Sequence, residues 1–178
     1  MNNAQSYEKI VKASVTGKRL ALRISVILSY LALAVVFLLF ALNNLNFFAV
    51  ILVMGAIVIF GVVRFTWKYL QLEFEYSFSY GVLSVAKIYG KRTRRQVAEG
   101  EIKSLLMIAP ATEENIASAD RLEPEERVIA VSSESAENIW LALTGDKDEK
   151  RVLIFFEADE RSLGILRAAN PYAFSKKI

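Results

Sequence analysis

The chain has 178 residues, of which 54% are hydrophobic, and it contains no cysteine and no histidine. This composition excludes disulfides, thiolate nucleophiles and zinc or iron sites built on Cys or His, and it removes the commonest general base. The net charge of +3 is uneven, because residues 1–68 carry seven Lys and Arg against the single Glu8, which leaves −3 for residues 69–178. The basic character therefore flanks the apolar segments and gives no sign of nucleic-acid binding.

Residues 1–23 are predicted to form an amphipathic segment on the cytoplasmic side of a membrane. Tyr7, Ile10 and Val11 recur at helical spacing, with charged side chains between them. This pattern predicts a short helix over about residues 5–15, ended near Thr16 and Gly17. Three alternatives stay open: such a helix lies along the membrane surface, it packs on the domain that follows, or the segment is frayed.

Residues 24–65 are predicted to form a two-helix transmembrane hairpin. Residues 24–42 and 47–63 carry no charge, and as helices they would span about 28 and 26 Å, close to the ~30 Å hydrocarbon core. The short polar break at residues 43–46 makes the helices antiparallel neighbours. Small residues in the second helix are expected to let the first approach closely, at Ala49, Gly55, Ala56 and Gly61. The apolar run is too long for a signal peptide.

The charges beside the apolar segments predict the orientation of the hairpin. Lys18, Arg19 and Arg23 precede the first segment, Arg64 and Lys68 follow the second, and the connection has no charge. Because cytoplasmic flanks carry the excess of Lys and Arg, both termini are expected in the cytoplasm of a multi-pass cell-membrane protein. No Asp, Glu, Lys or Arg lies inside either segment, so the sequence offers no ion path.

Residues 69–178 are predicted to be a small, mostly β domain. Five apolar or aromatic positions from Leu72 to Tyr80 alternate strictly with polar ones, the pattern of a half-buried strand. Turns at Gly81 and Gly90 lead into two further strands. Seven strands are expected, at residues 72–80, 82–89, 93–97, 105–109, 128–132, 139–143 and 152–156. A helix follows, with Asp159 as N-cap, Leu163, Leu166 and Ala169 as its inner stripe, and Asn170 and Pro171 at its end.

Seven strands closed by one helix is the order of a pleckstrin-homology (PH) domain, and three segments carry a resemblance that covers most of the chain. These are YEKIVKASVTGKR at residues 7–19, the pattern E-x-E-Y-x-F-x-x-G-x-L-x-V-x-K-I at 73–88 and ILRAANPYAF at 165–174. Together they resemble a clostridial-type family of bacterial membrane proteins with a membrane hairpin before a PH-like domain. The resemblance implies an α+β fold with membrane helices, whose PH-like seven-stranded barrel or sandwich is capped by the C-terminal helix. Its motifs bear on the fold and not on catalysis.

One cluster of side chains is a candidate site for anionic lipid, because clustered cations near anionic leaflets are attracted to them. It consists of Lys87, Lys91, Arg92, Arg94 and Arg95. The sequence leaves three readings open: recognition of a headgroup, looser contact with the membrane surface, and a solvated basic hairpin. PH domains bind phosphoinositides mainly at their first hairpin, and that hairpin carries no basic residue here.

The other candidate features are read as structural. An acidic stretch at residues 110–127 is expected to be a solvated loop open to interaction, without the spacing of a calcium loop. Glu99 and Glu101 are expected in a turn. Ser132, Ser133 and Ser135 match no nucleophile motif, no glycine-rich phosphate loop occurs, and Trp140 is expected to pack in or cap the barrel. No metal and no cofactor is implied.

The sequence therefore predicts a non-enzymatic, membrane-anchored interaction or regulatory module. Its partners are the lipid bilayer and membrane proteins, with anionic lipid as a further candidate and nucleic acid excluded. Two alternatives stay open: a sensor of anionic lipid at the inner surface, and an accessory subunit of a membrane transporter.

Overall fold

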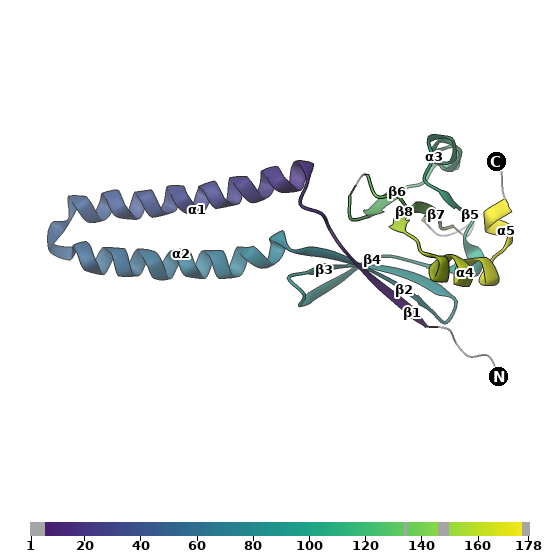
Figure 1. Cartoon of the computed structure of the whole chain (residues 1–178), viewed down its shortest axis with the longest axis horizontal. Helices are drawn as coiled ribbons and strands as arrows, with labels where there is room; N and C mark the ends of the chain where they lie inside the picture. The colour runs from purple at the N-terminus through teal and green to yellow at the C-terminus, as the bar shows by residue number, and fades with distance from the viewer. Residues whose placement is uncertain (1–5, 134, 146–149, 176–178) are drawn as a thin grey trace. The chain divides into compact units, whose positions relative to one another are not determined.

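The structure is a computed structural model that describes residues 6–133, 135–145 and 150–175 (Figure 1). The chain divides into two compact units. The helical unit comprises Ser14–Gln71 and the short segment Tyr89–Lys91. The β unit comprises the chain up to Ala13, then Leu72–Ile88 and the chain from Arg92 onwards. The membrane-type segments are thus inserted between the first strand and the rest of the β unit.

The helical unit is an antiparallel pair, as predicted. Helix α1 spans Gly17–Asn43, a 3-10 turn η1 covers Leu45–Phe47, and α2 spans Phe48–Leu70. The side-chain amides of Asn43 and Asn44 donate to backbone carbonyls four residues earlier, which satisfies groups left open where α1 ends. Both helices are long and apolar enough to cross a membrane.

Contacts between α1 and α2 are close at one of the predicted glycines and absent at the other. A Cβ atom added to Gly55 would lie 2.7 Å from Cγ of Phe37, so only glycine fits there, whereas one added to Gly61 meets nothing within 4 Å. Ala49 and Ala56 are exposed and do not line the contact. The helices are further joined by a hydrogen bond between the Tyr30 and Thr66 hydroxyls. Most other apolar side chains face outwards, as a lipid-facing surface requires.

The first sheet contains a strand that the sequence reading missed. Strand β1 (Tyr7–Lys12) pairs antiparallel with β2 (Leu72–Ser79), and β3 (Val82–Tyr89) and β4 (Thr93–Glu101) complete the order β1-β2-β3-β4. The predicted amphipathic helix over residues 5–15 is therefore wrong. Tyr7 and Val11 are four residues apart, a spacing that places side chains on one face of a helix and also of a strand. Pairing with β2 decides the outcome.

The second sheet has the order β5-β7-β8-β6, with β6 parallel to β8. Its strands are β5 (Met107–Pro110), β6 (Glu126–Ala130), β7 (Ile139–Leu143) and β8 (Val152–Glu157). All seven predicted strands exist and β1 is an eighth. In the described part of the chain they form two sheets of four and no closed barrel, so the predicted seven-stranded barrel or sandwich is corrected to two four-stranded sheets.

Helices and 3-10 turns complete the β unit: η2 (Ile102–Ser104), α3 (Glu113–Asp120), α4 (Glu160–Ala169) and α5 (Tyr172–Ser175). Helix α3 overturns the expectation of an irregular acidic loop, since Thr112 caps it through the Asn115 amide and Glu113 and Glu114 lie in its first turn. Asp159 is the N-cap of α4, as predicted, within a capping box that Ser162 completes.

The core of the β unit is built on aromatic side chains. Phe74, Tyr76, Phe78 and Phe156 are almost wholly buried, and the rings of Tyr76 and Phe156 meet edge to face with centroids 6.0 Å apart. Leu166 on α4 is buried in the same cluster, with Leu163 and Ala169 partly buried beside it. The inner stripe predicted for this helix is confirmed.

Candidate functional site

The predicted basic cluster lies on the β3–β4 hairpin, but its five side chains do not converge. Lys87 is half-buried on β3, whereas Lys91, Arg92, Arg94 and Arg95 are exposed. Neighbouring residues of a strand point to opposite faces, so Arg94 and Arg95 do not share a face of the sheet.

Arg94 already has a counter-ion within the protein. Its guanidinium lies 2.8 Å from a carboxylate oxygen of Glu75, whose side chain is only 8% exposed. A buried carboxylate needs a partner of opposite charge, so this pair serves the fold. The first arginine of β4 is therefore not free to hold an external anion, and the five residues do not make one site.

The remaining sequence candidates take structural roles. Glu99 accepts a hydrogen bond from the Gln96 amide, and both Glu99 and Glu101 belong to β4 instead of the expected turn. Trp140 packs on Phe174 with ring centroids 6.0 Å apart, as expected for a capping side chain. Among the described residues, no three acidic side chains lie close enough to hold a metal ion.

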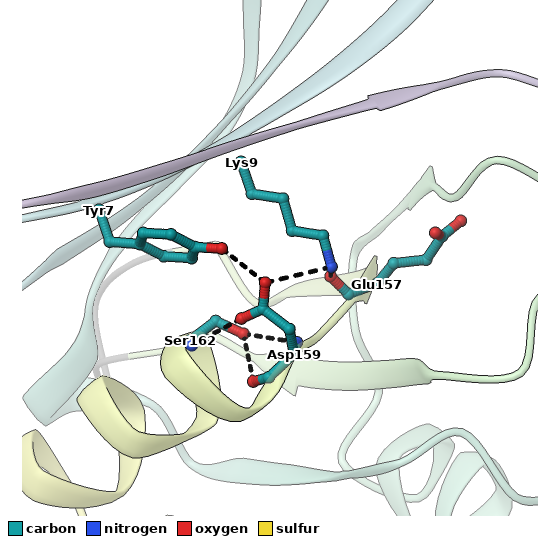
Figure 2. Close-up of polar contacts among 5 residues, drawn as sticks. All are labelled: Tyr7, Lys9, Glu157, Asp159 and Ser162. Carbon is teal, nitrogen blue, oxygen red and sulfur yellow. Dashed lines mark hydrogen bonds and ion pairs between the residues drawn. The ribbon is translucent and has the colours of Figure 1, made fainter.

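A polar cluster that the sequence reading did not foresee joins β1 to the start of α4 (Figure 2). The Tyr7 hydroxyl donates to Oδ2 of Asp159 at 2.5 Å, and Lys9 Nζ lies 3.5 Å from the same oxygen. Lys9 Nζ also donates to the Glu157 carbonyl at 3.2 Å. On the other side of the carboxylate, the Ser162 amide donates to Oδ1 at 2.8 Å. We call Tyr7, Lys9, Asp159 and Ser162 the polar junction.

The polar junction keeps Asp159 ionised. Burial favours the neutral acid, but hydrogen bonds from Tyr7 and Ser162 and the charge of Lys9 outweigh it and lower the pKa of Asp159 to about 2. The hydrogen bond to Asp159, together with burial, raises the pKa of the Tyr7 phenol. Near neutral pH Asp159 stays deprotonated and Tyr7 stays protonated, so neither group is suited to act as a general acid or base. The role that the contacts support is to hold β1 against α4.

The Tyr7 ring makes two further contacts. It stacks on Phe78 of the core, with centroids 6.1 Å apart and the rings 22° from parallel. The guanidinium of Arg161 lies 4.7 Å from the ring centroid. The N-terminal strand is thereby held at the same point by apolar, cationic and hydrogen-bonding contacts. Asp159 could be found from its N-cap position, whereas nothing local in the sequence indicates Tyr7 as its partner.

The side-chain amide of Asn170 explains the motif at residues 165–174. The side-chain nitrogen of Asn170, a buried residue, donates to the carbonyls of Ile102, Lys103 and Leu105 at 2.9, 3.1 and 3.1 Å. Its side-chain oxygen accepts from the Ala173 amide at 3.1 Å. Asn170 thus ties the end of α4 to the η2 turn that connects the two sheets. This confirms that the motif at residues 165–174 bears on the fold.

Comparison with known proteins agrees with this arrangement. No curated protein and no solved structure matches the chain significantly. A family model described as "Bacterial PH-like domain (DUF6106)" matches residues 4–176, a range that includes β1, both long helices and the Asn170 motif. With nearly its whole length matched, the chain belongs to this family of bacterial PH-like domains.

Proposed function

We propose that this chain is an integral protein of the bacterial cell membrane whose PH-like domain binds other membrane proteins from the cytoplasmic side, without catalysing a reaction. The family membership and the two long apolar helices support the coarse part of this proposal. The finer part rests on the pairing of two strands that lie on either side of the helices in the sequence. It rests also on the structural contacts that the polar side chains make.

The pairing of β1 with β2 is the observation that carries the proposal. β1 comes before α1 and β2 comes after α2, yet Lys12 pairs with Glu73 and Tyr7 with Phe78 in one continuous ladder. Two strands of one sheet must lie on the same side of a membrane. In a membrane, the chain between them would therefore cross an even number of times, which supports the proposed two crossings.

The charges supply the direction. The flanks of the two helices are basic and the connection at residues 44–47 has no charge. The excess of Lys and Arg favours the cytoplasm for the flanks and hence for the β unit.

A binding role, in place of catalysis, is supported by what the polar side chains already do. The polar junction, the Glu75–Arg94 pair and Asn170 all hold elements of the β unit together. The sequence provides no Cys or His for nucleophilic or metal chemistry. PH-like folds mainly present surfaces to partners, an argument by fold analogy.

Two alternative roles have less support. A lipid sensor that uses Lys87, Lys91, Arg92, Arg94 and Arg95 is weakened by the pairing of Arg94 with Glu75. A transporter subunit is weakened by the lack of any ionisable residue between residues 24 and 63 apart from Tyr30.

Cysteine labelling tests the topology, since the native chain has no cysteine to interfere. The variants Ser6→Cys, Asn46→Cys and Lys103→Cys place a thiol before β1, in the connection and in the β unit, at three exposed positions. In intact cells a membrane-impermeant maleimide should label only the Asn46→Cys variant. Labelling of the Ser6→Cys and Lys103→Cys variants alone would reverse the orientation. Different behaviour of those two variants would disprove the shared side.

The binding role is tested with photo-crosslinking amino acids placed in the full chain in native membranes. Tyr80 is 88% exposed and Ile129 is 61% exposed, both in the β unit, while Phe60 on α2 serves as a lipid-facing comparison. We expect one or both positions of the β unit to give discrete protein adducts that are reproduced in replicate experiments. Adducts to lipid alone at all three positions would contradict the proposal.

A further inference from the structure

The tip of the β3–β4 hairpin is fastened to the end of α2. The Gly90 amide donates to the Gln71 carbonyl at 2.9 Å, and the Tyr69 and Tyr89 rings lie with centroids 6.3 Å apart. Gly90 has φ +57°, and a Cβ atom there would lie 2.7 Å from Cβ of Lys68. Only glycine allows this approach, which brings the next residue, Lys91, to the end of the helix that carries Lys68.

The other cations of the helical unit lie at the same end. Arg19 and Arg23 are four residues apart near the start of α1, and Arg64 and Lys68 are four apart near the end of α2, so each pair shares a helix face. Arg23 Nη2 donates to the Leu70 carbonyl at 2.8 Å, which joins the start of α1 to the end of α2. We call Arg23, Arg64, Lys68 and Lys91 the cationic end of the helical unit.

No carboxylate balances these charges within their own unit. Ser14–Gln71 and Tyr89–Lys91 contain six Lys and Arg, Lys18 included, and no Asp or Glu. By contrast, Arg94 on β4 has Glu75 as its counter-ion. No side chain of opposite charge is therefore available to these cations within the helical unit.

Aromatic side chains lie at the same end of the helical unit, as is typical of the level of a membrane interface. Lys68 Nζ lies 4.5 Å from the ring centroid of Phe65 and 4.8 Å from that of Tyr69, and Trp67 is exposed beside them. Aromatic rings of this kind gather at the level of lipid headgroups. At that level the anions available in quantity are lipid phosphates.

We propose that the cationic end of the helical unit binds the phosphates of anionic lipids, and that the β3–β4 hairpin supplies Lys91 to this site. The inference rests on the membrane anchoring proposed above. The proposed lipid site therefore differs from the arginines of β4 that the sequence suggested. Its residues lie at the end of a continuous apolar surface, which would place them near lipid headgroups. Each Lys or Arg near an anionic surface increases lipid preference about fivefold.

The test uses the full chain in nanodiscs of phosphatidylcholine, alone or mixed with phosphatidylglycerol, with retained lipids identified by native mass spectrometry. The variant Arg64→Gln/Lys68→Gln/Lys91→Gln removes three charges from the cationic end. The matched control Lys103→Gln/Arg121→Gln/Lys150→Gln removes three exposed charges from the β unit. The first variant should lower the retention of phosphatidylglycerol relative to phosphatidylcholine by roughly tenfold to a hundredfold, and the control should leave it unchanged.

Further arms separate the outcomes. The charge-conserving variant Arg64→Lys/Lys68→Arg/Lys91→Arg should retain phosphatidylglycerol, which shows that folding is intact. Insertion into neutral nanodiscs without any preference for phosphatidylglycerol would overturn the lipid site and leave the anchor standing. Failure of the native chain to insert into either lipid would overturn both. Equal loss in the control, or full displacement of the lipid by inorganic phosphate, would also overturn the site.

Discussion

The hydroxyl of Tyr7 and the carboxylate of Asp159 are separated by 152 residues of chain and by 2.5 Å in space. This hydrogen bond fastens the first strand of the protein to the first turn of its last long helix. β1 is followed within five residues by the long apolar helix α1, so the junction holds the part of the β unit that directly precedes that helix.

Removing the Tyr7 hydroxyl should weaken the β unit without altering its shape. A hydrogen bond to a charged acceptor contributes roughly 1.5–3 kcal/mol, so the Tyr7→Phe variant should unfold more easily by about that amount. The measurement is urea unfolding in detergent, followed by tryptophan fluorescence. The control is Tyr80→Phe, at an exposed turn, which should change stability by less than about 0.5 kcal/mol. Equal effects would show that the junction contributes nothing.

Acid should loosen the junction in a defined range of pH. The pKa of Asp159 is about 2 in the folded protein and 3.8 when it is unperturbed. A lowered folded pKa stabilises the fold above about pH 4, and this contribution is lost as pH falls from about 4 towards 2. The unfolding midpoint of the native chain should therefore fall more steeply over this range than that of the Asp159→Asn variant. Parallel curves would contradict the lowered pKa.

Asn170 should be among the least replaceable side chains of the β unit. In the Asn170→Asp variant a carboxylate would face three carbonyl oxygens in a buried site, a loss of at least about 3 kcal/mol. Thermal unfolding measures the loss. Asn138→Asp makes the same change at an exposed position and should have little effect. A mild result at Asn170 would mean that the η2 turn holds without its amide.

Alanine variants at two glycines with positive φ distinguish the cost of backbone strain from the cost of close packing. Gly81 has φ +80° with open space around it, whereas Gly90 has φ +57° and lies against Lys68. The Gly81→Ala variant should therefore show only the left-handed strain, roughly 1–2 kcal/mol. Gly90→Ala should lose more and should increase hydrogen exchange at the Gly90 and Lys91 amides. The same response at both positions would argue against the attachment of the hairpin tip to α2.

The place of β1 predicts how a soluble form can be made. The Ala13 amide donates to the Leu72 carbonyl at 3.0 Å, so the ends left by removing residues 14–71 are adjacent. Joining them through Asn-Gly, a favoured two-residue turn, should yield a folded domain with native-like near-UV circular dichroism. Residues 69–178 alone lack an edge strand and half of the polar junction, and they should be less stable or aggregate. Equal stability of both forms would show that β1 is dispensable.

Local pattern predicted most elements and none of their long-range partners. Strict alternation marked β2, and the chemistry of Asp159 as an N-cap marked the start of α4. β1 was misread because Tyr7 and Val11 suit either period, and its partner strand lies beyond both apolar helices. The lack of information on long-range partners also explains why the candidate lipid site was misjudged. Arg94 appeared to be a free cation because nothing in the sequence says that Glu75 is buried opposite it.

The separation of β1 from β2 also sets an order of events during synthesis. Lys12 leaves the ribosome long before Glu73, its partner in the ladder, and at roughly 5–20 residues per second the wait is about 3–12 seconds. During that time the two long apolar segments are synthesised while the strand β1 remains unpaired. Glu8, Lys9 and Lys12 make half of the six residues of that strand charged, which protects a waiting edge from aggregation. The first sheet is complete only once Lys12 has paired with Glu73, so it cannot form before both apolar helices have been synthesised.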